Sequence, residues 1–114
     1  MDTEPLIMAA LSGITPKPEA LYSTAENGAD YIVFNDSDSR PALFGDGVDQ
    51  IWQSTVQVHY FTKSNPKAKT KAIRIALRNA GFVLSSQYRT FESDTGYYHT
   101  IIEATITGAS DMEE

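Results

Sequence analysis

The sequence predicts an α+β domain, in which a mainly antiparallel sheet of four or five strands is covered by an N-terminal helix and a central helix. Residues 49–61 alternate apolar or aromatic side chains with polar ones, the period of a strand with one covered face. Residues 66–80 place their apolar side chains on a single helical stripe. Repeated strand–helix units, which would indicate a doubly wound sheet, are missing from the sequence.

A short amphipathic helix is expected at the N-terminus. Asp2 or Thr3 can cap it, and Pro5 suits its first turn because the fixed φ of proline matches a helix start. Ser12-Gly13 then ends it. The side chains expected on its covered side are Leu6, Ile7, Ala10 and Leu11.

The next stretch is predicted to be extended and then to turn. Two prolines in residues 15–18 cannot continue a helix. Residues 19–24 are either an edge strand or extended chain. The Asn27-Gly28 dipeptide predicts a turn, and residues 30–34 form a compact apolar strand.

Residues 35–49 are predicted to form a long loop, since turn formers flank an apolar middle, Ala42-Leu43-Phe44, that fits no strand period. Within it, residues 36–40 partly match the start of a calcium loop, but Arg40 and Pro41 break that pattern, so a polar turn is expected. The apolar middle needs a cover, either from its own domain or from a partner.

The central strand and helix form the unit around which the other elements are built. The strand should cover one face with Trp52, Ser54, Val56, Val58 and Tyr60. Ser64-Asn65-Pro66 predicts the helix start and Gly81 its end. The apolar stripe of the helix comprises Ala68, Ala72, Ile73, Ala76, Leu77 and Ala80. A basic stripe of Lys67, Lys71, Arg74 and Arg78 lies opposite, and it is either a solvated face or a contact for an acidic surface such as a neighbouring copy.

Two strands are expected after the helix, at residues 82–92 and 97–107, joined by a tight hairpin at 93–96. In the first strand, Phe82, Leu84 and Tyr88 should share a side. In the second, the shared side comprises Tyr98, Ile102, Ala104 and Ile106. The acidic tail, 108–114, is expected to fray.

Length and composition indicate one domain over residues 1–114, ordered over about 3–107, and the protein is expected to be cytosolic where it is made. A net charge of −6 disfavours nucleic acid as a partner. No apolar run is long enough for a membrane span, and the acidic start is unlike a signal peptide. The chain has no cysteine, which leaves no disulfide and no thiolate ligand.

Residues that carry chemistry are few. Asp94-Thr95-Gly96 matches the triplet of retroviral-type aspartic proteases, but its position late in the chain favours a hairpin turn. His59 and His99 would form a metal site with Glu103 only if their strands were neighbours in register, and solvent-facing side chains are expected instead. The sequence therefore predicts no enzyme, no catalytic residue, no metal and no cofactor.

The order of the elements resembles a family of phage proteins. Tyr31–Phe34, a long loop, the alternating strand 53–61, the helix from Pro66 to Gly81 and a hairpin together resemble the tail terminator, or tail completion, proteins that join heads to tails in long-tailed bacteriophages. The resemblance spans residues 3–107 and consists of patterns rather than invariant residues.

That resemblance implies a structural virion protein of the tail or neck. It would assemble as a ring, usually of six copies, that caps the tail tube and contacts the tail tube protein and the head connector protein. The alternatives are a minor capsid protein, a head–tail connector or stopper protein, and a non-catalytic α+β interaction module. Exposure and composition suggest the candidate contact residues Leu43, Phe44, Asp46, Asp49, Lys67, Lys71, Arg74 and Arg78.

Overall fold

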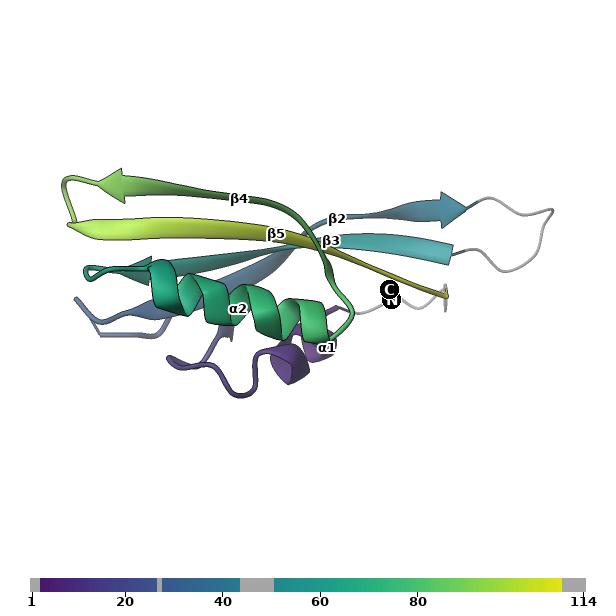
Figure 1. The fold of residues 1–114 in the computed structure, drawn as a ribbon, viewed down its shortest axis with the longest axis horizontal. Helices are drawn as coiled ribbons and strands as arrows, with labels where there is room; N and C mark the ends of the chain where they lie inside the picture. The colour runs from purple at the N-terminus through teal and green to yellow at the C-terminus, as the bar shows by residue number, and fades with distance from the viewer. Residues whose placement is uncertain (1–2, 27, 44–50, 110–114) are drawn as a thin grey trace.

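A computed structural model describes residues 3–26, 28–43 and 51–109, with side chains over 3–26, 28–40 and 52–108. One sheet has the strand order β1-β2-β3-β5-β4, in which β1 is parallel to β2 and the other neighbours are antiparallel. Both helices lie on the same face of this sheet (Figure 1). The predicted α+β class is confirmed. The elements are α1 (Glu4–Ala10), β1 (Glu19–Ala20), β2 (Tyr31–Leu43), β3 (Ile51–Thr62), α2 (Lys67–Asn79), β4 (Val83–Glu92) and β5 (Tyr97–Ala109).

Strand β2 is much longer than the sequence predicts. It continues through residues 35–43, so the predicted loop there, including the polar turn at 36–40, is wrong. Two register shifts against β3, between Asp36 and Asp38 and between Pro41 and Leu43, interrupt the alternation of side chains. At the first shift Ser37 is the extra residue, and its hydroxyl donates to the carbonyl of Thr55 at 3.2 Å. These irregularities hide the two-residue period on which the prediction depended.

Strand β3 is the centre of the sheet, and its predicted covered face is confirmed. Val56 and Val58 are fully buried, and Ser54 and Tyr60 nearly so. The strand pairs with β5 continuously, from Ile51 opposite Ala109 to Thr62 opposite Tyr98. Because β3 has a long strand on each side, it separates the two edges of the sheet.

Helix α1 is attached to β2 by its first residues. Thr3 occupies the N-cap position, but its hydroxyl donates to the carboxylate of Asp36 instead of capping the helix. Ile7 and Leu11 are fully buried as predicted, whereas Leu6 is 38% exposed. The helix therefore covers the β2 side of the sheet.

Helix α2 covers the β5 and β4 side. Asn65 accepts a hydrogen bond from the Lys67 N–H at 3.0 Å, and Gly81 leaves the helix with a φ of 97°, as the sequence predicts. The buried stripe differs from the predicted one, because it consists of Thr70, Ile73 and Leu77 while the predicted members Ala68 and Ala80 are exposed. Thr70 fits the interior because its hydroxyl donates to the Pro66 carbonyl at 2.7 Å.

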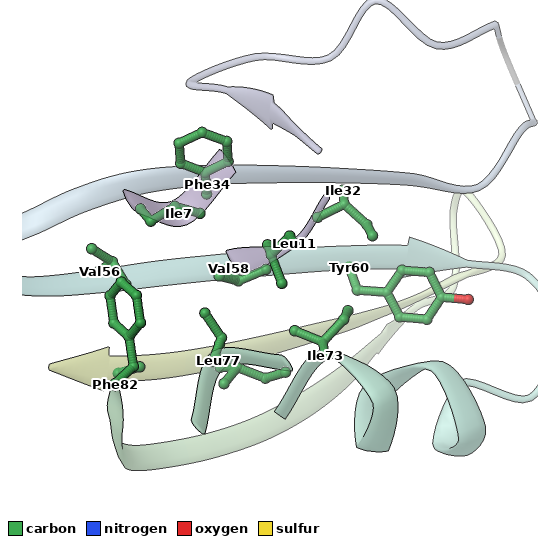
Figure 2. Packing of buried hydrophobic residues seen from close by; sticks show 12 residues of the cluster. Ile7, Leu11, Ile32, Phe34, Val56, Val58, Tyr60, Ile73, Leu77 and Phe82 are labelled. Carbon is green, nitrogen blue, oxygen red and sulfur yellow. The ribbon is translucent and has the colours of Figure 1, made fainter. Parts of the chain in front are cut away.

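The core lies between the two helices and the sheet (Figure 2). Side chains from α1, β2, β3, α2 and β5 meet there, and burial of this apolar area is the main stabilising contribution. The buried cluster comprises Ile7, Leu11, Ile32, Phe34, Val56, Val58, Tyr60, Ile73, Leu77, Phe82, Ile102 and Ala104.

The β4–β5 hairpin turns at residues 93–96, as predicted, with Gly96 at a φ of 81° and its N–H bonded to the Glu92 carbonyl at 2.7 Å. Asp94 is an exposed turn residue. A register shift between Leu84 and Ser86 reverses the side of the residues after it. Tyr88 therefore lies opposite Ile101 on the uncovered face, and its predicted place beside Leu84 is wrong.

Candidate functional site: two unlike edges and an open face

A groove of about 410 Å³ runs between α2 and the edge strand β4. We call it the basic groove, because three cations of the predicted basic stripe line it: Lys71, Arg74 and Arg78. Apolar side chains form the rest of its surface, among them Ile75, Leu84 and Ile102. This combination suits an extended segment that brings carboxylates and apolar side chains together.

Arg74 is fixed within the groove, since its guanidinium donates to Gln87 Oε1 at 2.9 Å and so joins α2 to β4. Lys67 lies apart from the other three cations. It lines a separate hollow near the start of α2, together with Lys63, Arg89 and Tyr98. The structure therefore brings together three of the four predicted basic residues.

Strand β4 ends the sheet on the groove side, so its outer backbone edge has no neighbouring strand among the described residues. Large side chains along it are exposed: Val83 by 70%, Phe91 by 56% and Tyr88 by half. Unpaired edges that carry apolar side chains are sites at which another strand can add.

The opposite end of the sheet is also open. Strand β1 pairs only with Val33 and Phe34, which leaves the rest of β2 without a strand on that side in the described part of the chain. Three carboxylates, of Glu4, Glu19 and Asp36, and one cation, Lys17, line the two hollows that border this edge, so negative charge is in excess there. We call this region the acidic corner.

Hydrogen bonding favours the charged form of Glu19 in the acidic corner. Thr24 donates both its hydroxyl and its backbone N–H to the Glu19 carboxylate, the latter at 2.9 Å. These bonds lower the pKa of Glu19, with the hydroxyl of Thr24 as the largest cause. The exposed side chains of Leu21 and Tyr22 follow directly, so this edge also combines charge with apolar surface.

Four of the predicted contact residues are not tested by this geometry. Leu43 is the last residue of β2, and its side chain lies outside the described residues, as do Phe44, Asp46 and Asp49 altogether. The structure therefore describes the four basic residues of the predicted contact set but not the side chains of its four loop residues.

The uncovered face of the sheet carries polar rows that cross the strands. Gln57 donates to Glu103 at 2.8 Å, and Ser86 donates to the same carboxylate at 3.3 Å. Beside them runs a longer row, which we call the histidine row: Asn35 on β2, His59 on β3, His99 on β5 and Glu92 on β4. It spans the four long strands.

The two histidines are in direct contact. His59 Nδ1 lies 2.9 Å from His99 Nε2, His59 Nε2 lies 3.1 Å from Asn35 Oδ1, and His99 Nδ1 lies 3.6 Å from a Glu92 oxygen. They were predicted to be solvent-facing, but they are partly buried, and the ring of His99 stacks on Phe61 with the centroids 4.0 Å apart.

Burial lowers the pKa of both histidines, because desolvation disfavours the charged imidazolium. The nearby His99 lowers the pKa of His59 further, whereas Glu92 partly offsets the effect at His99. Glu103 does not join the histidines, since it bonds to Gln57 and Ser86 instead. Among the described residues, no group of three or more His, Cys, Asp or Glu side chains converges as metal ligands do.

The sequence could raise the contact between His59 and His99 only as a condition on strand register, and it gave no sign that the condition is met. Phe61 pairs with His99 and His59 pairs with Ile101, so the histidines are diagonal neighbours. A side chain can reach its diagonal neighbour across a sheet, but only the strand register reveals the pair. The sole available signal was that both residues occupy the polar side of their strands.

Comparison with protein-family models and with curated proteins finds no match to this sequence. In the described part of the chain, neither helix has the length and apolar character needed to cross a membrane. The surfaces themselves are therefore the basis for a functional proposal.

Proposed function

We propose that this chain is a structural protein of a long-tailed bacteriophage that assembles head-to-tail as a ring, in the role of a tail terminator that caps the tail tube and joins it to the head. The observation that carries the proposal is the pair of open sheet edges, one acidic and one basic, at opposite ends of a single sheet. The resemblance of the sequence to that family supplies the position in the virion and the expected six copies.

The strand directions favour a cyclic arrangement. Strands β2 and β4 run in opposite directions, because three successive antiparallel pairings separate them. A second copy rotated about an axis roughly along the strands would therefore place its β2 antiparallel to β4 of the first copy. Such a contact uses two different surfaces, and repeated rotation closes it into a ring.

Charge favours the head-to-tail contact between β4 and β2 over a two-fold contact between two β4 strands. A β4-to-β4 dimer would bring Lys71, Arg74 and Arg78 close to the same three cations of the second copy, and like charges across an interface are costly. Contact between the basic groove and the acidic corner pairs opposite charges. In an assembled ring, the remaining surfaces would be available to the tail tube protein and the head connector protein.

The first test measures self-association. We expect the Lys71→Glu, Arg74→Glu double variant to weaken it and to reduce its salt dependence, as measured by light scattering and chemical cross-linking over a concentration series. The matched control is Lys63→Glu, Lys67→Glu, which changes the net charge equally but lies outside the basic groove. Equal effects of the two double variants would argue against the groove as the contact.

The second test concerns the role in the virion. Loss of a tail terminator should leave overlong tails without heads, as seen by electron microscopy. Normal tails beside filled or leaking heads would instead favour the alternative of a connector, stopper or minor capsid protein.

A further inference from the structure

The hollow near the start of α2 is a second basic region of this acidic protein, and we call it the Arg89 hollow. It has a volume of about 440 Å³, and Lys63, Lys67 and Arg89 contribute three positive charges to its lining. Among the described residues that line it, none is Asp or Glu. Its volume is within the range of pockets that hold small organic ligands. Local charge therefore favours an anion here, although the net charge of the chain is −6.

Arg89 is held in this hollow by neutral partners. Its Nε donates to Thr100 Oγ1 at 2.9 Å and its Nη2 donates to Thr70 Oγ1 at 3.3 Å, and both threonines are almost completely buried. These two bonds use only part of the five N–H donors of a guanidinium. Among the described residues, no carboxylate forms an ion pair with Arg89, although this residue is partly buried. A bound anion would supply the counter-charge that a partly buried cation favours.

The two lysines add positive charge to the same hollow. Lys67 is exposed, and its ammonium has no hydrogen-bond or ion-pair partner in the described part of the chain. The ammonium of Lys63 lies 5.1 Å from the centre of the Tyr97 ring. A phosphate monoester has a charge of about −1.5 to −2 at pH 7 and three acceptor oxygens, so it can bond to the guanidinium fork and to a lysine at once. A carboxylate has a single charge and two oxygens, and it matches this set of cations less completely.

An aromatic surface lies beside the cations. Tyr98 lines the hollow and is 36% exposed, and its ring centroid lies 5.0 Å from that of Phe91. Arg89 pairs with Thr100 and Phe91 pairs with Tyr98, so Arg89 and Tyr98 are diagonal neighbours on β4 and β5. Diagonal neighbours are roughly 7–8 Å apart. A nucleoside phosphate can bridge this spacing with its base on the aromatic ring and its phosphate at the guanidinium, because every base has a face that stacks.

We propose that the Arg89 hollow binds a nucleoside phosphate, with Arg89 and Lys67 holding the phosphate and Tyr98 stacking on the base. The site goes beyond the proposed function and does not depend on ring assembly, because it is separate from the basic groove. A free mononucleotide and the phosphorylated end of a single-stranded nucleic acid present the same chemical group. Titrations with AMP and with a 5′-phosphorylated oligonucleotide distinguish these two sources by which one binds more tightly.

The test is a nuclear magnetic resonance titration of the full chain at low ionic strength, with AMP, inorganic phosphate and adenosine as the probes. AMP should bind at least fivefold more tightly than inorganic phosphate, because stacking of the base adds to the contacts of the phosphate. Adenosine, which lacks the phosphate, should show no saturable binding. The backbone signals of Lys67, Arg89 and Tyr98 should shift during the AMP titration.

Substitutions separate the contacts of the ligand. Arg89→Gln should weaken AMP binding about tenfold or more. Lys67→Gln should weaken it by a smaller factor, and since Lys67 is exposed, this variant does not put the fold at risk. The matched control is Arg40→Gln, which removes the same charge from an exposed side chain that pairs with Asp38 and should leave the affinity unchanged. Tyr98→Leu should remove the advantage of AMP over inorganic phosphate, while circular dichroism confirms the fold of each variant.

Three results would overturn the proposal. The first is the absence of saturable AMP binding by the unmodified protein. The second is an AMP affinity that Lys67→Gln and Arg89→Gln change no more than Arg40→Gln does. The third is tighter binding of phosphotyrosine than of AMP, which would assign the site to a phosphorylated protein. Light scattering measures ring assembly separately, so loss of one activity does not imply loss of the other.

Discussion

At the scale of single residues, side chains at the interface between α2 and the sheet determine how stable the domain is. Leu77 is fully buried in the core, whereas Ile75 on the same helix is partly exposed beside the basic groove. Their difference in burial, within one element, isolates the contribution of packing from that of helix propensity.

Leu77→Ala should lower the free energy of unfolding by about 2–5 kcal/mol, because it removes buried methyl groups and leaves a cavity. Ile75→Ala should cost less than half as much, since water already reaches that side chain. Urea denaturation of both variants measures the difference. Equal losses would show that α2 does not pack as described.

The histidine row makes stability depend on pH. The pKa of both histidines is lowered in the folded protein, so below the ordinary value of 6.5 the unfolded chain binds more protons than the folded one. Stability should therefore be complete above that pH and should fall as the pH drops from 6.5 through the lowered pKa values. In metal-free buffer, thermal unfolding at pH 7.5 and pH 5.5 measures this loss.

The double variant His59→Gln, His99→Gln is the control, and it should flatten the dependence within this range. Hydrogen bonds from Thr24 lower the pKa of the Glu19 carboxyl, so this group stays ionised across the range and does not interfere. An unchanged slope in the double variant would assign the effect to other groups.

At the scale of elements, sequence periodicity predicted the regular elements of the fold. The alternation in β3 and the glycine that ends α2 identified the central unit, and both are confirmed. In β2 and β4 the predictions from periodicity were wrong, because single extra residues shift the strand register there. The sequence shows such a residue only as a break in pattern, and a break also looks like a loop.

Gly81→Ala tests the end of α2. The backbone there has a φ of 97°, which disfavours any residue with a Cβ, so the variant should lose about 1 kcal/mol of stability or more. Gly13→Ala is the matched control, because neither position has a heavy atom within 4 Å of the added Cβ and Gly13 lacks a positive φ. Chemical denaturation should show little change for the control.

At the scale of the whole molecule, the separation of charge matters more than the net charge of −6. The sequence suggested a basic stripe and an acidic remainder, but it did not indicate that three cations lie at one end of the sheet and that three carboxylates with a single lysine, Lys17, lie at the other. Strand order decides that arrangement, and strand order results from long-range pairing that local sequence does not encode.

A charge swap tests ring assembly directly. Lys71→Glu, Arg74→Glu and Glu4→Lys, Glu19→Lys should each prevent self-association alone, because every contact then joins like charges. An equal mixture of the two double variants should assemble again, since alternating copies restore opposite charges at every contact of a ring with an even number of subunits. Light scattering on the mixture measures this, and no recovery would contradict the proposed contact.

The position of β5 in the sheet has a consequence for biosynthesis. This strand lies between β3 and β4, yet the ribosome makes it after both of them. Until it emerges, β3 of a nascent chain is paired on one side only, with β2, and β4 has no neighbouring strand in the sheet. Strands β4 and β5 can pair locally through the turn at residues 93–96, but the pairing of β5 with β3 is non-local, so the sheet is completed by a step that is slow compared with hairpin closure and that leaves the open edge of β3 exposed in the interval.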